Sequence, residues 1–479
     1  MISQPHAPGT APRPTAPPAT APSTGSSGPL TGPDPRPRGP VGRVVAGSLA
    51  TGLVAALLLV AAPFVPARQS ALTGAVLCGF ALGWAMLAVL SVRFTDQPQR
   101  WAVAPAVFMG LGGVLLVGFG SSVHGALDWV WPPALLTLVI WMIVRVRRQL
   151  HSRGGRWLLH PVITMLALAA IGGGYQTVGA AADAAAHPMP GQLIDVGGHR
   201  LHLNCTGSGS PTVVLEPGAG EMSSNLGWIT PAVARGTRVC AYDRAGRGWS
   251  EPADTPQDGA QIATDLHTLL HRGHVPGPYV LAGHSFGGLY VLTFAARYPD
   301  EVAGMVLLDS TAPKPAAPKP AAPGAVQPAD GGRPDVLGRA SALVSASARL
   351  GLGRLYARFD VGSLPPGSRD EARASIATPD NLRSTIDEYV QANTSMQQAA
   401  ELRDFAGKPL VVLTAGSGSD SAWSAKQDRL AALSPDSVHR VVAGATHEML
   451  VADEKAAAGT TQAILEVVSS VRGAGRPTR

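Results

Sequence analysis

A serine between glycines is the first feature of this sequence that could do chemistry. The segment Gly283–Gly287, which reads GHSFG, follows an apolar run from Tyr279 to Ala282 that has the composition of a buried strand. A stretch with helical periodicity, Leu289 to Tyr298, comes directly after it. A tight strand-to-helix turn needs small neighbours and holds a serine hydroxyl clear of the sheet. We therefore expect Ser285 to be a nucleophile.

A serine hydroxyl is a weak nucleophile and needs a base to take its proton. His447 lies in the segment GATH at 444–447, just after an apolar run that ends at Val442. In the chain order nucleophile, acid, histidine, the base comes last and follows the final strand. This position predicts that His447 is the general base for Ser285.

The histidine in turn needs a carboxylate that orients its ring and stabilises its charged form. Asp420 lies in the loop after the run from Leu410 to Thr414, the usual place for this acid, and is the expected residue. Asp309, at the end of the preceding run, is the alternative, and Glu448 is a third.

Two backbone N–H groups are expected to bind the negative charge that develops on an attacked carbonyl oxygen. One belongs to Phe286, which follows the serine. The second is expected from the glycine-rich segment Pro217–Gly220, where Ala219 is the predicted donor. These donors complete a site for acyl chemistry that requires no metal and no cofactor.

With these pieces in order, residues from about 190 to 472 resemble the α/β-hydrolase superfamily. Tyr242–Ser250, which reads YDRAGRGWS, is similar to the Y-D-R-x-G-x-G-x-S segment of that superfamily, and GHSFG is similar to its G-H-S-x-G turn. The resemblance implies an α/β fold with an eight-stranded, mostly parallel sheet flanked by helices, and a serine acyl-enzyme. Pro217–Gly218 stands where the family often has His-Gly, which changes polar contacts but keeps the backbone donor.

The periodicity of the C-terminal part agrees with that fold. Short β-rich runs alternate with amphipathic helical stretches over residues 188–475, beginning with a hairpin turned at Gly197-Gly198. Residues 311–405 interrupt the strands. They open with a Pro-Ala-Lys linker, 311–328, and continue with helical patterns, so we expect an inserted cap over the sheet.

The N-terminal part has a different composition. Residues 1–40 are rich in Pro, Ala, Thr, Ser and Gly and are expected to be disordered. Residues 41–180 hold five apolar runs, each near the roughly 20 residues that cross a bilayer as a helix. These runs are Val44 to Val65, Ala71 to Val92, Trp101 to Phe119, Leu127 to Val144, and Trp157 to Val178.

Arginines set the expected orientation of these five helices. The loop between the fourth and fifth runs carries the densest cluster and should face the cytoplasm. This cluster is Arg145, Arg147, Arg148, Arg153 and Arg156. Alternation then places everything after Val178 outside the cell membrane. The net charge of +6 gives no reason to expect nucleic acid as a partner, because these arginines flank apolar runs.

Two of the three cysteines fall on strands expected to be neighbours. Cys205 ends the second strand and Cys240 lies in the fourth, so they could form a disulfide in an outer compartment or remain buried thiols. Cys78 falls in the second apolar run.

The sequence therefore predicts a membrane-anchored serine hydrolase, acting at a bilayer on small-molecule or lipid-like esters or related acyl substrates. Transfer of the acyl group to an alcohol or to peroxide is an alternative outcome of the same chemistry. A non-enzymatic sensor or binding protein is a further alternative, which the intact Ser-His order disfavours.

Overall fold

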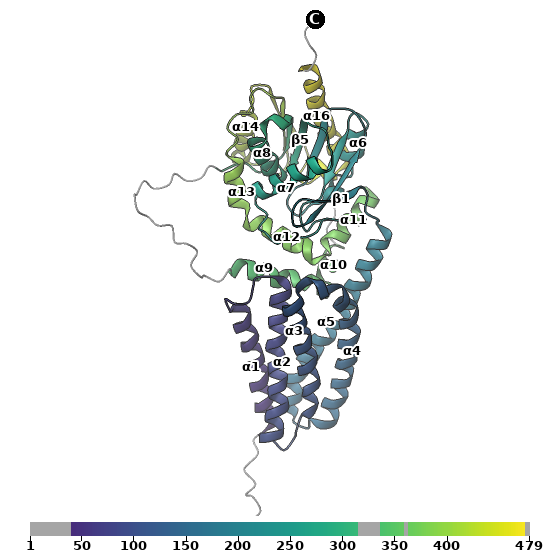
Figure 1. The fold of residues 1–479 in the computed structure, drawn as a ribbon, viewed down its shortest axis with the longest axis vertical. Helices are drawn as coiled ribbons and strands as arrows, with labels where there is room; N and C mark the ends of the chain where they lie inside the picture. Colours follow the sequence, from purple (N-terminus) through teal and green to yellow (C-terminus); the bar gives the residue numbers. More distant parts are fainter. Residues whose placement is uncertain (1–39, 315–335, 359–362, 475–479) are drawn as a thin grey trace, which may run out of the picture.

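The computed structural model describes residues 40–314, 336–358 and 363–474. They form a bundle of long helices and, above it in Figure 1, a domain built on a β-sheet. Residues 1–39 of the tail predicted to be disordered (1–40) and most of the predicted linker at 311–328 lie outside the described residues.

Five helices form the N-terminal bundle, as the apolar runs predicted. They are α1 (Val41–Ala61), α2 (Gln69–Phe94), α3 (Val103–Phe119, after a short turn η1 at Arg100–Ala102), α4 (His124–Gln149) and α5 (Arg153–Ala186). All five spans are long and apolar enough to cross a membrane, with mean hydropathy between 1.6 and 2.4. Helix α5 continues well past the predicted limit at Val178, so it carries the chain from the bundle to the sheet domain.

Small residues bring the first two helices into contact. Gly79 of α2 lies against Ala56 of α1, where a Cβ atom on the glycine would come within 2.4 Å of the Ala56 backbone. Gly83 approaches Gly52 in the same way, with 2.9 Å from its would-be Cβ to the Gly52 Cα. Close backbone approach through small residues is how helices pack in a bilayer, where there is no hydrophobic driving force between them.

The second part is an eight-stranded sheet with the order β1-β2-β4-β3-β5-β6-β7-β8. Strands β1 and β2 pair antiparallel, β2 joins β4 antiparallel, and every later pair is parallel, as predicted. The strands are β1 (Gln192–Asp195), β2 (Arg200–Thr206), β3 (Thr212–Glu216), β4 (Val239–Tyr242), β5 (Tyr279–His284), β6 (Val302–Leu308), β7 (Leu410–Ala415) and β8 (Ser437–Val442).

Helices cover both faces of this sheet. On one face α7 (Gly259–Arg272) and α8 (Gly287–Arg297) pack against Val214 and Leu281. On the other face α6 (Ile229–Ala234) and α16 (Glu454–Ala474) pack against Val213 and Val280. Neighbouring residues of each strand thus enter different cores, which is why the central strands are apolar throughout and do not alternate.

Cys205 of β2 lies directly opposite Cys240 of β4 in the antiparallel register. The two residues are joined by a disulfide. This decides between the two states that the sequence left open, because the register, and not merely the strand order, brings the two sulfur atoms together.

Between β6 and β7, inside the predicted insertion 311–405, the described residues form five helices. They are α9 (Val336–Ala346), α10 (Leu352–Tyr356, preceded by the turn η5 at Ser347–Leu350), α11 (Pro366–Ile376), α12 (Pro379–Val390) and α13 (Ala392–Ala399). Figure 1 shows α9 and α10 directly on the end of the bundle, with α11 to α13 against the sheet domain. We call this group of helices the cap.

Arginines of the cap fix it to the bundle. Arg339 donates to the carbonyl oxygen of Val60, near the end of α1, at 2.5 Å and to that of Val65, in the loop that follows, at 2.6 Å. Arg349 pairs with Asp128 of α4 at 3.0 Å, and Arg354 pairs with Asp183 of α5 at 2.7 Å. Because these contacts reach several helices, the cap is held against the bundle as well as against the sheet.

Candidate active site

Ser285 occupies the turn between β5 and α8 with a φ angle of 54°, in the left-handed region that side chains other than glycine rarely adopt. Its neighbours explain how the turn fits. A Cβ atom at Gly283 would lie 2.6 Å from the Gly287 carbonyl oxygen, and one at Gly287 would lie 2.4 Å from that of Glu216. Only glycine is accommodated at both positions, so sterics require the two glycines of GHSFG.

Hydrogen bonds from the surrounding backbone hold this strained residue. The Ser285 N–H donates to the Leu308 carbonyl at 3.1 Å, and its own carbonyl accepts from Gly288 and Thr311 at 3.1 and 3.0 Å. The side chain of Ser285 is half-buried at the carboxyl end of the parallel strands. A strained residue kept in place by its surroundings is common at functional sites.

His447 follows β8 in the loop before α15 (Met449–Ala452) and faces a buried carboxylate. Its Nδ1 atom lies 2.6 Å from Oδ2 of Asp309, which comes directly after β6. The other oxygen of Asp309 accepts from the indole of Trp423 at 2.7 Å and from the N–H of Ala415 at 3.3 Å. Burial alone would raise the pKa of Asp309, but the donors His447 and Trp423 hold it below its ordinary value.

The carboxylate beside His447 is therefore that of Asp309, and the prediction that Asp420 orients this histidine is wrong for the described geometry. Asp420 is exposed and caps the N-terminus of α14 (Ser421–Ala431), where its Oδ1 accepts from the Trp423 N–H at 2.7 Å. Both aspartates border a cavity of about 560 Å³ beside His447. The hydrogen bond that Asp420 makes as the N-cap residue, however, turns its carboxylate toward the start of α14. Glu448, the third candidate, is exposed.

The loop after β3 lies against the serine. A Cβ atom at Gly218 would come within 3.1 Å of the Ser285 Cβ, so only a glycine lets the loop approach this closely. Carboxylates hold two of its amides: Gly218 donates to Glu221 at 2.6 Å and Gly220 donates to Glu388 at 3.1 Å. Among the hydrogen bonds of the described residues, the amides of Ala219 and Phe286 have no acceptor. The two predicted oxyanion donors are thus not engaged by another group among the described residues.

His284 joins this loop to the loop that carries His447. Its Nδ1 lies 3.0 Å from the Glu221 carboxylate, and its Nε2 lies 3.2 Å from the backbone oxygen of His447. The rings of His284 and His447 are 4.7 Å apart between centroids. Burial lowers the pKa of His284, but the facing Glu221 outweighs burial and raises it above the ordinary value.

A buried charge network stands behind the same loop. Arg244 donates to Glu216 at 2.6 Å, to Glu388 at 2.9 Å, and to the carbonyls of Pro217 and Gly218 at 2.7 and 2.6 Å. This network extends the Tyr242–Ser250 motif into the cap, because Glu388 belongs to α12.

Glu388 is shared by two arginines, since Arg247 also pairs with it at 2.7 Å. Burial raises the pKa of Glu388, but the two guanidinium groups overcome that effect and hold it below its ordinary value. Sequence reasoning missed Glu221 and Glu388. Glu221 directly follows the glycine-rich segment, so a sequence argument could have found it. Glu388 comes from a distant helix with no motif around it.

A cavity of about 580 Å³ opens between this loop and the cap. Its walls include Ala219, Gly220, Tyr356, Leu364 and Tyr389. A larger hollow of about 990 Å³ lies between α6 and α16, and none of the residues discussed above lines it. The cavity at Ala219 thus borders the loop that packs against Ser285, and the cavity of about 560 Å³ borders His447.

A family model described as the alpha/beta hydrolase fold matches residues 211–454. An uncharacterized protein of Schizosaccharomyces pombe is 33% identical over 151 residues, 25% of this chain and 28% of that protein. A 2-(acetamidomethylene)succinate hydrolase of Mesorhizobium japonicum is 31% identical over 137 residues, 27% of this chain and 46% of that protein. The chain thus spans less than half the length of these curated relatives.

Among solved structures, the epoxide hydrolase CorEH matches with a TM-score of 0.46 and 21% identity, over 59% of this chain and 99% of that chain. The enol-lactonase from Burkholderia xenovorans matches with a TM-score of 0.42 and 20% identity, over 58% of this chain and 100% of that chain.

The buried network makes a prediction about stability. The substitution Glu388→Gln removes the negative charge that two buried arginines share. Removing one partner of a buried ion pair lowers the free energy of unfolding by about 3–5 kcal/mol. We expect this loss in a guanidinium titration of the detergent-solubilised protein, followed by tryptophan fluorescence.

Asp370→Asn is the matched control, because Asp370 forms an exposed ion pair with Arg373 within the cap. Its cost should stay below about 1 kcal/mol. Equal unfolding midpoints for the two variants would show that Glu388 is not the buried link described above.

Proposed function

The chain belongs to the α/β-hydrolase family, and on that premise we propose that it is a membrane-anchored serine hydrolase that cleaves esters or related acyl substrates. The observation that carries this proposal is the pair His447–Asp309 beside the strained turn of Ser285. A serine at position 285 favours an acyl-enzyme, since chemistry through a covalent aspartyl ester would need an aspartate there.

The proposed reaction begins with attack of the Ser285 hydroxyl oxygen on the substrate carbonyl carbon. Because Asp309 engages Nδ1 of His447, the Nε2 atom is the one that takes the hydroxyl proton. The N–H groups of Ala219 and Phe286 stabilise the oxyanion. His447 then gives its proton to the leaving alcohol as the carbon–oxygen bond breaks, and an acyl-serine remains.

Water completes the cycle in the proposed mechanism. His447 removes a proton from a water molecule as its oxygen attacks the acyl carbon, and the same donors stabilise the second oxyanion. The Ser285 oxygen leaves with the proton that His447 returns. The products are an acid and an alcohol, and the enzyme is regenerated.

We also propose that the five helices cross the cell membrane and that the sheet domain lies on its outer side. The arginine cluster at 145–156 falls at the ends of α4 and α5 that are farthest from the sheet domain, which suits a cytoplasmic face (Figure 1). A disulfide between Cys205 and Cys240 suits an oxidising compartment on the opposite face.

Ser285→Ala tests the nucleophile. We expect a fluorophosphonate probe to label the wild-type protein and not this variant, because the probe reacts only with an activated serine. In-gel fluorescence of the purified protein measures the labelling. Ser417→Ala, in the wall of the cavity beside His447, is the control and should label normally. Equal labelling of Ser285→Ala and wild type would remove the assignment.

Asp309→Asn and Asp420→Asn distinguish the two candidate acids. We expect Asp309→Asn to lower kcat for a nitrophenyl ester by about 10⁴-fold, because an amide cannot stabilise the imidazolium and favours the wrong tautomer. Asp420→Asn should retain nearly full activity, since asparagine is also a good N-cap for α14. A larger loss for Asp420→Asn than for Asp309→Asn would reverse the assignment.

A further inference from the structure

A cavity of about 380 Å³ lies inside the helix bundle, at the end that faces the cap. Helices α2 to α5 form its sides, and α9 and η5 of the cap close the end toward the sheet domain. Apolar side chains line most of it, among them Leu77, Met109, Leu116, Leu135 and Leu166. Its volume is within the range of small-molecule sites, which are about 300–1,000 Å³ and mostly apolar.

The polarity of this cavity changes along its length. At the cap end Arg349 pairs with Asp128 at 3.0 Å and approaches Nδ1 of His124 at 3.1 Å. Leu135 lies about three turns farther along α4 than His124, which is about 16 Å deeper. The cavity therefore has a polar mouth at the cap and an apolar floor within the bundle.

The bundle cavity and the cavity at Ala219 share a lining residue. Ser347, the first residue of η5, borders the 380 Å³ cavity within the bundle and also the 580 Å³ cavity that reaches Ala219 and Gly220. The start of η5 therefore lies between the apolar space of the bundle and the cavity that borders Ala219.

We propose that the bundle cavity holds the acyl chain of the substrate, so that the substrate class is long-chain fatty-acyl esters. This inference rests on the proposed function. The chain would lie among the side chains of α2 to α5, its ester group would pass the polar mouth at Arg349, and its carbonyl carbon would meet Ser285. An amphipathic lipid ester matches a pocket that is apolar at one end and polar at the other.

Ala169→Phe tests the proposal. Ala169 lines the cavity on α5, so a phenyl ring there would occupy the space of the chain. Leu168→Phe is the matched control, because the neighbouring Leu168 is 58% exposed on the outer surface of the same helix. The measurement is kcat/KM of each full-length protein in detergent, with nitrophenyl acetate and nitrophenyl palmitate.

We expect Ala169→Phe to lower kcat/KM for the palmitate by at least about tenfold and to leave the acetate unchanged, since lost pocket contacts affect only the long chain. Leu168→Phe should change neither. An unchanged ratio of the two substrates in Ala169→Phe would overturn the acyl-chain assignment while leaving the esterase intact. Wild-type protein that hydrolyses neither ester would instead overturn the proposed function.

A photoreactive palmitate analogue supplies a readout that does not depend on turnover. Incubated with Ser285→Ala protein and irradiated, it should cross-link to cavity residues of α3 to α5, and Ala169→Phe in the same background should abolish these cross-links. Cross-links confined to outward-facing residues of the bundle would contradict the proposal.

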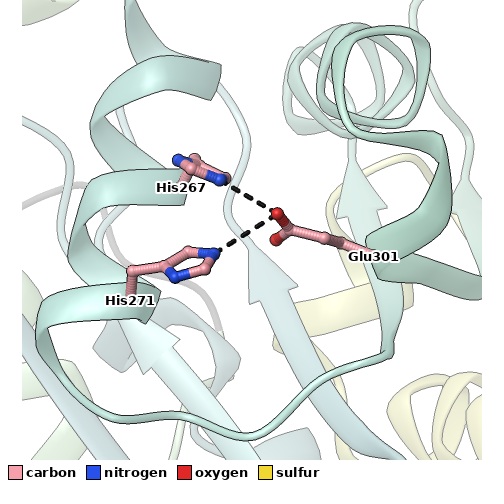
Figure 2. A group of neighbouring side chains, drawn as sticks. All are labelled: His267, His271 and Glu301. Carbon is pink, nitrogen blue, oxygen red and sulfur yellow. Dashed lines mark hydrogen bonds and ion pairs between the residues drawn. The ribbon is translucent and has the colours of Figure 1, made fainter.

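A separate cluster of side chains lies at the other end of the sheet domain. Figure 2 shows His267 and His271, one turn apart on α7, pointing toward Glu301. Their Nε2 atoms lie 2.9 and 3.3 Å from the same Glu301 oxygen, and the other oxygen of Glu301 is buried without a hydrogen-bond partner among the described residues. Glu301 precedes β6 and Asp309 follows it, eight residues later, so the two backbones are about 26 Å apart along the strand.

We further infer that this cluster binds a zinc ion, with water as a fourth ligand. One donor atom from each residue lies within 4.8 Å of the others, and two imidazoles with one carboxylate are a donor set that zinc accepts in tetrahedral geometry. Stacking of His267 on Tyr298, with centroids 4.0 Å apart, fixes the orientation of one ligand. The site lies away from Ser285, and a zinc ion bound there would tie α7 to the start of β6.

The test uses the untagged full-length protein, stripped with a chelator and titrated with zinc against a chromophoric indicator. We expect one zinc ion per chain, a higher midpoint temperature with zinc, and an affinity at least about tenfold weaker in His271→Ala. His187→Ala, at the end of α5, is the control and should bind as wild type. Equal affinity in His271→Ala, or no stoichiometric binding, would overturn the assignment.

Discussion

The carboxylate of Glu388, buried between Arg244 and Arg247, is the interaction on which the arrangement of the site depends. Arg244 donates hydrogen bonds to the carbonyls of Pro217 and Gly218, and Glu388 accepts one from the Gly220 amide. The loop is therefore held on both sides of Ala219. Removing ions from water costs several kcal/mol each, and a buried cluster is tolerated only when nearly every group is paired. The network therefore favours one loop geometry, in which the Ala219 N–H has no acceptor among the described residues.

The same network makes the cap part of the site. Glu388 belongs to α12, and the cap that contains it is anchored to the bundle through Arg339, Arg349 and Arg354. A displacement of the cap relative to the bundle would therefore move Glu388 and with it the Gly220 amide that it accepts from. The reason is that each link in this series is a short ion pair or a hydrogen bond to the backbone. The strained turn at Ser285, by contrast, is held within the sheet domain by glycine packing and by the Leu308 carbonyl. One half of the site is thus fixed by the sheet and the other half by the cap.

Local patterns account for what the sequence could predict. The GHSFG turn, the strands around it and the five apolar runs each carry their signal within a short window, and all three are present as expected. The acid was assigned wrongly because Asp309 and Asp420 both follow neighbouring strands. The preference of aspartate for N-caps could have shown that Asp420 starts α14. Glu388 lies 144 residues from Arg244 along the chain, in a helix without a motif, so only the folded cap reveals the pair. The disulfide required the register of β2 against β4, which strand order does not supply.

Anchoring alone does not account for the shape of the bundle. An unfilled apolar cavity forfeits dispersion contacts on all its walls, so a bundle that served only as an anchor would be expected to close it. Small residues do close such space between α1 and α2, where Gly79 and Gly83 bring the helices into direct contact. On α5 the small residues Ala169 and Gly173 instead border the cavity below η5 and leave it open. Small residues thus bring helices into direct contact between α1 and α2, but on α5 they border a cavity. That cavity lies at the end of the bundle that the cap covers.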